Sequence, residues 1–205
     1  MSERSIVVVS GGLSQPSSTR MLADRLADAT VSALAERGVA ARVTVVELRD
    51  LAHDVVDMTL TGFAREPLAE AQEAVAAADG VVAVSPVYTA SYAGLFKSFV
   101  DVLDKDALRG TPVLLGATGG TPRHSLAVDH ALRPLFAYLG ADVVPTGVFA
   151  ATDDWADAGT DDTSPLPDRI RRAGEQLAER VAGRAPVRRT GLYDAVPSFE
   201  DLLGA

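Results

Sequence analysis

Three segments rich in glycine and hydroxyl side chains follow apolar runs in this 205-residue sequence. The first, residues 10–19 (SGGLSQPSST), joins a glycine pair that includes Gly12 to Ser17, Ser18 and Thr19 at an expected helix start. Glycine lets the backbone turn tightly, and hydroxyls with free amides at a helix N-terminus bind phosphate. These four residues are therefore candidate ligands of a phosphate monoester. One hydroxyl can instead serve only as the N-cap of the helix, a role that the sequence fits equally well.

This first segment differs from two common phosphate-binding motifs. It lacks the GK[ST] ending of a P-loop, and Leu13 stands where a GxGxxG fingerprint has its second glycine. Glu47, close to the end of the second apolar run, could imitate the ribose-binding acid of a dinucleotide fold. Because the glycines of that fingerprint are missing, we expect Glu47 to be a solvated surface carboxylate.

The second segment, residues 85–92 (SPVYTASY), has the composition of a binding edge for a flat ring. Pro86 removes one amide and fixes the direction of the chain, so that Val87 and Tyr88 can present amides and an aromatic ring to a planar heterocycle. An alternative is that Tyr88 and Tyr92 are ordinary half-buried aromatic residues.

The third segment, residues 117–122 (ATGGTP), places Thr118, Gly119 and Gly120 directly after another apolar run. Backbone amides that are free at such a loop can donate hydrogen bonds to a ring carbonyl and a ring nitrogen. Two glycines after a strand are also common in ordinary left-handed turns. This segment therefore indicates a ligand site only in combination with the other two segments.

The elements that must position these segments alternate between β-branched runs and Ala-rich amphipathic stretches, which is typical of an α/β fold with a parallel sheet. We expect strands over residues 5–9, 42–48, 80–85, 112–117 and 143–148, helices over 19–37, 67–79, 93–103, 124–139 and 168–181, and a loop over 49–66. Ligands of an open parallel sheet bind beyond the carboxyl ends of its strands, where the winding direction reverses. The three segments should therefore meet at one edge.

The three segments together would supply a phosphate end, an aromatic edge and an amide-rich edge. A mononucleotide with a polar tricyclic ring fits this arrangement, so FMN fits better than ATP. Flavin chemistry needs orientation from the protein but no nucleophile and no metal. The sequence agrees, because it has no GxSxG or HExxH motif and its histidines are only His53, His124 and His130. We expect no catalytic side chain and no metal ligand.

Composition limits the partners and the compartment. The net charge of -9 disfavours nucleic acid and anionic membranes, and the absence of cysteine excludes disulfides, iron–sulfur clusters and a thiol nucleophile. No apolar run approaches the roughly 20 residues of a membrane span, and no signal-peptide pattern is present, so we expect a cytoplasmic protein.

We expect one domain over residues 1–183 and a C-terminal extension over 184–205 that packs on its own subunit, a neighbouring subunit or a partner enzyme.

Three longer stretches of the sequence resemble the NADPH-dependent FMN reductase family, and especially the flavin reductases of two-component alkanesulfonate monooxygenase systems. These stretches are SPVYTASYAGLFKSFVDVLD, LRGTPVLLGATGG and HSLAVDHALRPLFAYLGA. The resemblance covers about residues 6–181. It implies a flavodoxin-like three-layer sandwich with strand order 2-1-3-4-5, reduction of FMN by NADPH or NADH, release of FMNH2 to a partner monooxygenase, and a homodimer or homotetramer.

The resemblance also implies roles for individual positions. The hydroxyl pair that holds the FMN phosphate in the family is matched by Ser17 and Thr19, and a glycine, Gly12, stands where a serine is usual. The segment that edges the isoalloxazine is matched by Pro86, Val87 and Tyr88. The loop at the pyrimidine side of the ring is matched by Thr118, Gly119 and Gly120. His130 falls where the sulfonate-system reductases carry an inserted residue. That insertion makes a π-bulge at a tetramer interface and is linked to flavin that is exchanged as a substrate.

Two other hypotheses remain at this stage. One is an enzyme that holds FMN tightly and reduces quinones or azo dyes. The other is a flavodoxin-like electron carrier without nicotinamide activity, although flavodoxins usually show a T-x-T-G-N-T type of first loop, which this sequence lacks.

Overall fold

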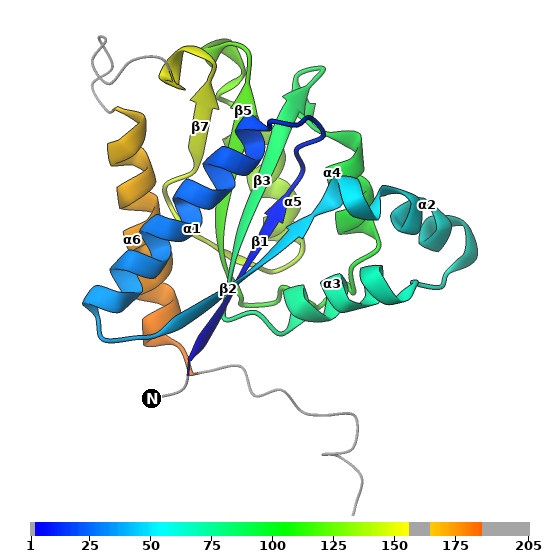
Figure 1. Cartoon of the computed structure of the whole chain (residues 1–205), viewed down its shortest axis with the longest axis horizontal. Coiled ribbons are helices and arrows are strands. Elements are labelled where there is room, and N and C mark those ends of the chain that lie inside the picture. Colours follow the sequence, from blue (N-terminus) through cyan, green and yellow to red (C-terminus); the bar gives the residue numbers. More distant parts are fainter. Residues whose placement is uncertain (1–2, 156–164, 186–205) are drawn as a thin grey trace, which may run out of the picture.

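The computed structural model describes residues 3–155 and 165–185, which form a parallel sheet between two layers of helices (Figure 1). The seven strands of this part of the chain are β1 (Arg4–Ser10), β2 (Ala41–Glu47), β3 (Gly80–Tyr88), β4 (Ser91–Tyr92), β5 (Pro112–Gly119), β6 (Asp142–Val143) and β7 (Val148–Ala151). The strand order is β2-β1-β3-β5-β6, with β7 also paired to β5 and the short β4 antiparallel to β3. The predicted order 2-1-3-4-5 is confirmed.

The predicted fifth strand over residues 143–148 is wrong in its bounds, because that stretch is interrupted. β6 and β7 pair with opposite ends of β5 and leave residues 144–147 between them. Pro145 in this gap has no amide to donate to a sheet ladder, and Gly147 weakens strand geometry further. The two pieces together occupy the expected edge position.

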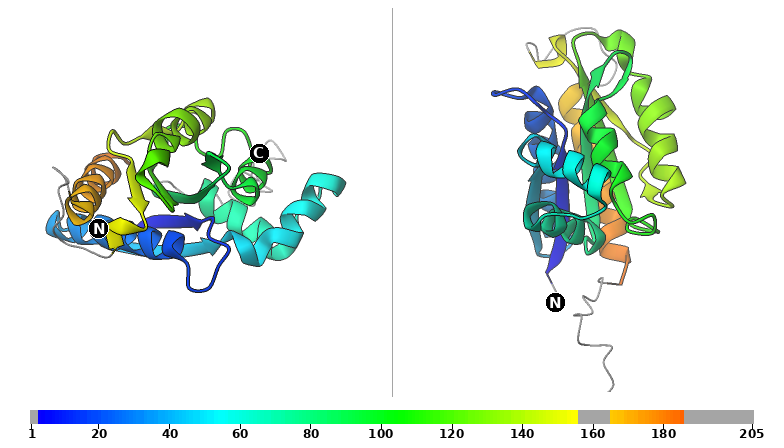
Figure 2. Two further views of the ribbon diagram at one scale, coloured as in Figure 1. Left: turned by 90° about the horizontal axis from the view of Figure 1, so that it is seen from above. Right: turned by 90° about the vertical axis from the view of Figure 1, so that its right-hand side faces the viewer.

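The helices of the described residues are α1 (Ser18–Glu36), α2 (Ala52–Thr61), α3 (Glu66–Ala76), α4 (Gly94–Asp101), α5 (Arg133–Tyr138) and α6 (Leu166–Gly183). Helices α1 and α6 lie side by side on one face of the sheet, and α3, α4 and α5 cover the other (Figure 2). Alternate residues of β1 supply the two cores: Ile6 and Val8 pack towards α1 and α6, whereas Val7 and Val9 pack towards α3 and α4.

The predicted loop over residues 49–66 is wrong, because most of it is helical. A 3-10 turn at Leu48–Leu51 leads into α2, which ends at Gly62 in the left-handed conformation (φ 78°). Of the α2 residues only Val55 is buried, and Leu60 and Phe63 are 79% and 80% exposed. The apolar residues of this segment therefore do not form one inward stripe, and the periodic pattern that predicts a helix is weak.

The predicted helix over residues 124–139 is divided into three parts. A 3-10 turn at Pro122–His124 is followed by a π-helix at Val128–Leu132 and then by α5. The Arg133 amide donates to the carbonyl of Val128, five residues earlier, as a π-helix requires. The π-bulge that the family resemblance implied at His130 is confirmed.

Gly174 lets α1 and α6 approach closely, and its substitution should lower stability. A Cβ at Gly174 would lie 2.8 Å from the backbone carbon of Ala29. We expect Gly174→Ala to lower the free energy of unfolding by about 1 to 3 kcal/mol through overpacking, despite the higher helix propensity of alanine. Urea unfolding measures this loss. Gly183→Ala is the matched control, because a Cβ there meets nothing within 4 Å and stability should not fall.

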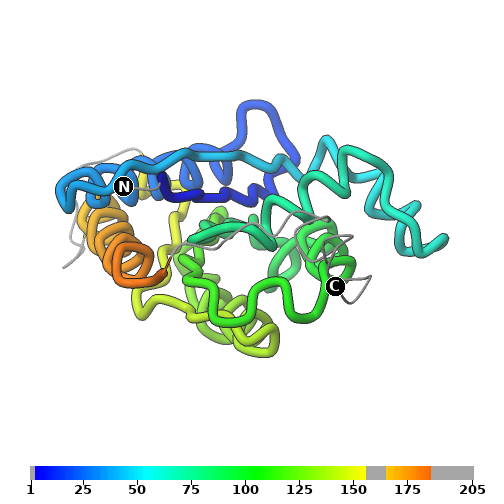
Figure 3. The backbone as a smooth tube through the Cα atoms, turned by 90° about the horizontal axis from the view of Figure 1, so that it is seen from below, coloured from blue at the N-terminus to red at the C-terminus, as the bar shows by residue number. Residues whose placement is uncertain are grey.

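The edge of the sheet where β1 begins lies opposite the three candidate segments, and α6 also ends there (Figure 3). Arg4 and Asp79 form a buried ion pair at this edge, with Nη1 and Oδ1 3.1 Å apart. Arg4 also donates to the carbonyl of Arg184. Apart from Arg184 and Ala185, the predicted C-terminal extension lies outside the described residues. Within those residues, no helix combines the length and the apolar character needed to cross a membrane.

Candidate functional site

The three segments singled out by sequence meet at the carboxyl edge of the sheet, where β1, β3 and β5 end (upper edge in Figure 1). The Gly11 amide donates to the carbonyl of Val84 at 2.8 Å, which ties the first segment to β3. Thr19 Oγ1 lies 2.8 Å from Thr118 Oγ1, which ties the first segment to β5. The predicted juxtaposition of the three segments is confirmed.

Ser17 caps helix α1, and this role leaves its proton available. Ser17 Oγ accepts a hydrogen bond from the Arg20 amide at 3.2 Å, so the capping interpretation is confirmed. A hydroxyl that accepts through oxygen can still donate its own proton, and phosphate oxygens only accept. Because the first turn of α1 contains no acidic residue, the positive end of the helix dipole remains open to an anion. Capping and phosphate binding by Ser17 are therefore compatible, and Ser18 beside it is exposed.

Gly12 lies close against Ser17, so that a side chain at this position would push the Ser17 hydroxyl aside. A Cβ at Gly12 would lie only 2.1 Å from Ser17 Oγ and 3.2 Å from Thr19 Cβ. Where the family usually has a serine, this chain has Gly12, and the hydroxyl of Ser17 lies in the space that a serine side chain would need. The hydroxyl of Ser10, at the end of β1, is buried and has no hydrogen-bond partner among the residues that the structure describes.

The second segment is a tight hairpin in which β3 turns back into β4. Thr89 and Ala90 have φ angles of 50° and 66°, which are left-handed values that non-glycine residues rarely adopt. Ser85 supports the turn from below, because its Oγ accepts from the Ala93 amide at 3.0 Å and donates to the Pro86 carbonyl at 2.9 Å. Such strain is maintained where surrounding structure enforces it, and functional sites are a common place for it.

The residues of this hairpin differ in exposure in a way that separates their roles. Pro86 is buried, Val87 is partly buried and Tyr88 is 47% exposed at the rim. Tyr92 instead packs on Phe96, with ring centroids 6.4 Å apart, so the half-buried interpretation is confirmed for Tyr92. Tyr88 thus remains the aromatic candidate for contact with a planar ligand.

The third segment divides into a buried residue and two accessible glycines. Thr118 is buried within β5, whereas Gly119 is partly exposed and Gly120 is exposed. A Cβ at Gly119 would lie 2.9 Å from Cζ of Phe149, so this position has little room for a side chain. Phe149 on β7 is a neighbour of the site that sequence reasoning missed, since nothing in its local pattern distinguishes it from a core aromatic residue.

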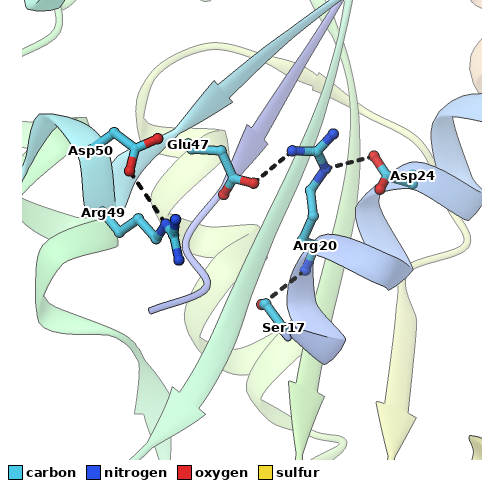
Figure 4. A network of polar contacts seen from close by, with 6 residues as sticks. All are labelled: Ser17, Arg20, Asp24, Glu47, Arg49 and Asp50. Atoms are coloured by element: carbon cyan, nitrogen blue, oxygen red, sulfur yellow. Dashed lines mark hydrogen bonds and ion pairs between the residues drawn. The ribbon is translucent and has the colours of Figure 1, made fainter. Parts of the chain in front are cut away.

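An ionic network borders the first segment, as Figure 4 shows. Arg20 lies between Asp24 and Glu47, with Nε to Oδ1 and Nη1 to Oε1 distances of 2.7 and 2.6 Å, and the hydrogen bonds that it donates to these two carboxylates raise the pKa of the Arg20 guanidinium. Arg49 pairs with Asp50 at 3.3 Å. Glu47 is therefore not the freely solvated carboxylate that its sequence position suggested.

Four residues of this network line a hollow of about 380 Å³ beside the first segment, together with Ser17: they are Arg20, Asp24, Glu47 and Arg49. Because two carboxylates already neutralise Arg20, the phosphate candidate site consists of hydroxyls, amides and the helix dipole rather than a free arginine. Sequence reasoning overlooked Arg20, although its position directly after Thr19 could have drawn attention to it.

These groups fit a phosphorylated flavin. Ser17 and the α1 N-terminus offer donors to a phosphate, Gly12 leaves no side chain in the way, and the ends of β3 and β5 provide an aromatic rim and two accessible glycines. No group of three or more His, Cys, Asp or Glu side chains within residues 3–155 and 165–185 is arranged to hold a metal ion. Lys97 on α4 forms an exposed ion pair with Asp101, with Nζ and Oδ1 2.6 Å apart.

The fold and this edge define the protein as a member of the flavodoxin-like α/β class. A WrbA-like flavodoxin from Agrobacterium tumefaciens, 16% identical, superposes with a TM-score of 0.60 over 90% of this chain and all of its own, which shows the shared fold. The family model for NADPH-dependent FMN reductases matches residues 4–156, and the chain belongs to this family of oxidoreductases.

Individual relatives agree with this assignment. An FMN reductase (NADPH) from Pseudomonas aeruginosa is 40% identical over 88% of this chain and 94% of its own, and the NADH-dependent FMN reductase SfnE from Pseudomonas putida is 36% identical over 90% and 96%. An oxidoreductase structure from Corynebacterium diphtheriae is 45% identical, with a TM-score of 0.85 over 89% of this chain and 99% of that one.

Proposed function

We propose that this protein is an NAD(P)H-dependent FMN reductase that moves a hydride from C4 of the reduced nicotinamide to N5 of FMN. The balanced reaction consumes NAD(P)H, FMN and one proton and yields NAD(P)⁺ and FMNH2. The observation that carries the proposal is the meeting, at one sheet edge, of the capped α1 N-terminus with the ends of β3 and β5. Membership of the FMN reductase family supports the same reaction.

The protein's own groups bind and orient the reactants. Ser17 and Thr19 would hold the phosphate by their hydroxyl protons, aided by Ser18 and the free amides of the first turn of α1. Pro86, Val87 and Tyr88 would edge the isoalloxazine, and the amides of Gly119 and Gly120 would face its pyrimidine side. FMN itself accepts the hydride when bound, so none of these side chains needs to act as acid, base or nucleophile.

The nicotinamide would lie over the open face of the flavin, next to the exposed ring of Tyr88. Relatives named for NADPH and for NADH are similarly close to this chain, so both nucleotides are proposed as reductants. We propose that the reaction takes place in the cytoplasm, where cells keep their pools of reduced pyridine nucleotide.

The π-helix at Val128–Leu132 supports the finer proposal that FMN is exchanged as a substrate and that FMNH2 is delivered to a flavin-dependent monooxygenase. Within the resembling family, this insertion accompanies exchangeable flavin. The neighbouring Leu126 and Tyr138 are 62% and 87% exposed, which leaves apolar surface next to the π-helix. That surface supports the proposal of a homodimer or homotetramer, in which the extension over residues 184–205 packs on its own or a neighbouring subunit.

Spectrophotometry tests the reaction directly. With excess FMN in air, the purified protein should oxidise NADPH or NADH continuously, because oxygen regenerates the oxidised flavin. Without oxygen, one FMN should be bleached for each NAD(P)H consumed. No oxidation of either nucleotide would refute the proposal. A tightly bound yellow flavin that survives purification and reduces added quinones would favour the quinone reductase hypothesis.

A further inference from the structure

The buried hydroxyl pair formed by Thr19 and Thr118 joins two parts of the site that the family resemblance treats separately. Their Oγ1 atoms lie 2.8 Å apart, the two residues are only 3% and 4% exposed, and 99 positions separate them in the sequence. Thr19 belongs to the first turn of α1 at the phosphate end, and Thr118 belongs to β5 next to the ring end.

Only one proton can lie between the two oxygens of such a pair, so the other hydroxyl proton must point elsewhere. If Thr19 donates to Thr118, Thr19 presents only its lone pairs to a ligand. If Thr118 donates to Thr19, the Thr19 proton is free at the N-terminus of α1. Phosphate oxygens accept hydrogen bonds and do not offer a proton in their dianionic form, so a bound phosphate selects the second arrangement.

We propose that Thr118 is a positioning residue for the flavin phosphate, acting through Thr19 as the first donor of a two-hydroxyl relay. This inference rests on the proposed function, and it changes the role that the resemblance assigns to Thr118 at the pyrimidine side of the ring. The hydrogen-bond partner of Thr118 supports the change, because the Thr118 hydroxyl lies 2.8 Å from Thr19 Oγ1 at the phosphate end, whereas the accessible residues of its own segment are Gly119 and Gly120.

A comparison of FMN with riboflavin, which lacks the phosphate, separates the two roles of Thr118. We expect Thr118→Val to raise the Kd for FMN about 10-fold, the upper scale of one hydrogen bond between neutral groups, and to change the Kd for riboflavin less than about 2-fold. Thr118→Ser keeps the hydroxyl and should stay within about 3-fold of the parent for both. Isothermal titration calorimetry on the flavin-free protein measures all six constants.

A second measurement checks that Thr118 acts through Thr19. In a Thr19→Val background, the further change Thr118→Val should leave FMN affinity unchanged, because the relay has already lost its final donor. Circular dichroism confirms that each variant is folded, and Thr118→Ala replaces Thr118→Val in both measurements if the valine variant does not fold.

Four outcomes would overturn the relay. Equal losses for FMN and riboflavin would place Thr118 at the ring, as the resemblance implied. An unchanged FMN affinity in Thr118→Val, or an additive loss in the double variant, would show that the relay does not operate. Failure of the parent protein to bind either flavin would instead refute the proposed function, and the relay with it.

Discussion

Replacing Ser17 and Thr19 together with alanine is expected to weaken FMN binding by about 2 to 5 kcal/mol, because two charge-assisted hydrogen bonds to the phosphate are lost. Ser17 keeps a proton to donate while it caps α1, and Thr19 lies in the same helical turn. The ionic partners of Arg20 already engage its guanidinium, so this arginine is not free to compensate. Isothermal titration calorimetry of the flavin-free protein gives the two dissociation constants.

Two controls separate ligand contact from helix capping. Ser17→Gly removes the hydroxyl but costs an N-cap only a few tenths of a kcal/mol, so a loss of FMN affinity in this variant does not come from fraying of α1. A double variant with Thr59→Ala and Ser98→Ala removes two hydroxyls that bond only within their own helices, and its FMN affinity should be unchanged. An unchanged dissociation constant in Ser17→Ala with Thr19→Ala would move the phosphate away from α1.

The largest effect on stability is expected from Asp79→Ala at the opposite edge of the sheet. The Asp79 carboxylate pairs with Arg4 at 3.1 Å and accepts from the Ser5 amide at 2.8 Å, and both charged residues are buried. Removing one partner of a buried pair leaves an uncompensated charge, so we expect the free energy of unfolding to fall by about 3 to 5 kcal/mol. Chemical unfolding followed by circular dichroism measures the change.

The matched control is Asp101→Ala, which breaks the exposed pair with Lys97 and should cost less than about 1 kcal/mol. FMN affinity of the folded Asp79→Ala protein should equal that of the parent, because β1 runs from this edge to the candidate site at its other end. Equal stability losses in Asp79→Ala and Asp101→Ala would contradict the buried-pair account.

The strand order and the meeting of the three segments could be predicted from sequence for a simple physical reason. Strands buried on both faces appear as continuous apolar runs, and right-handed crossovers then bring their carboxyl ends to one edge. Gly12, Ser17 and Thr19 are recognisable because the glycines and hydroxyls lie next to each other in sequence. The same local logic singled out Pro86–Tyr88 as a candidate binding edge, although it did not predict that β3 turns back into β4 there.

The parts that sequence reasoning missed depend on contacts between distant residues. Leu60 on α2 and Phe63 just beyond its end are exposed, so the apolar residues of this segment do not mark one face. The bond between Thr19 and Thr118 joins positions 99 residues apart, and the ion pair of Arg20 with Glu47 depends on how α1 packs beside β2. The π-helix at Val128–Leu132 could be expected from family resemblance but not from propensity, since one inserted residue leaves no local mark.

The most direct test of the whole account is a crystal structure of this protein soaked with FMN. The account predicts the phosphate at the N-terminus of α1, within hydrogen-bond distance of the Ser17 and Thr19 hydroxyls. It also predicts the isoalloxazine between Tyr88 on one side and the amides of Gly119 and Gly120 on the other. Flavin density at any other surface, or an empty strand edge at saturating FMN, would contradict it.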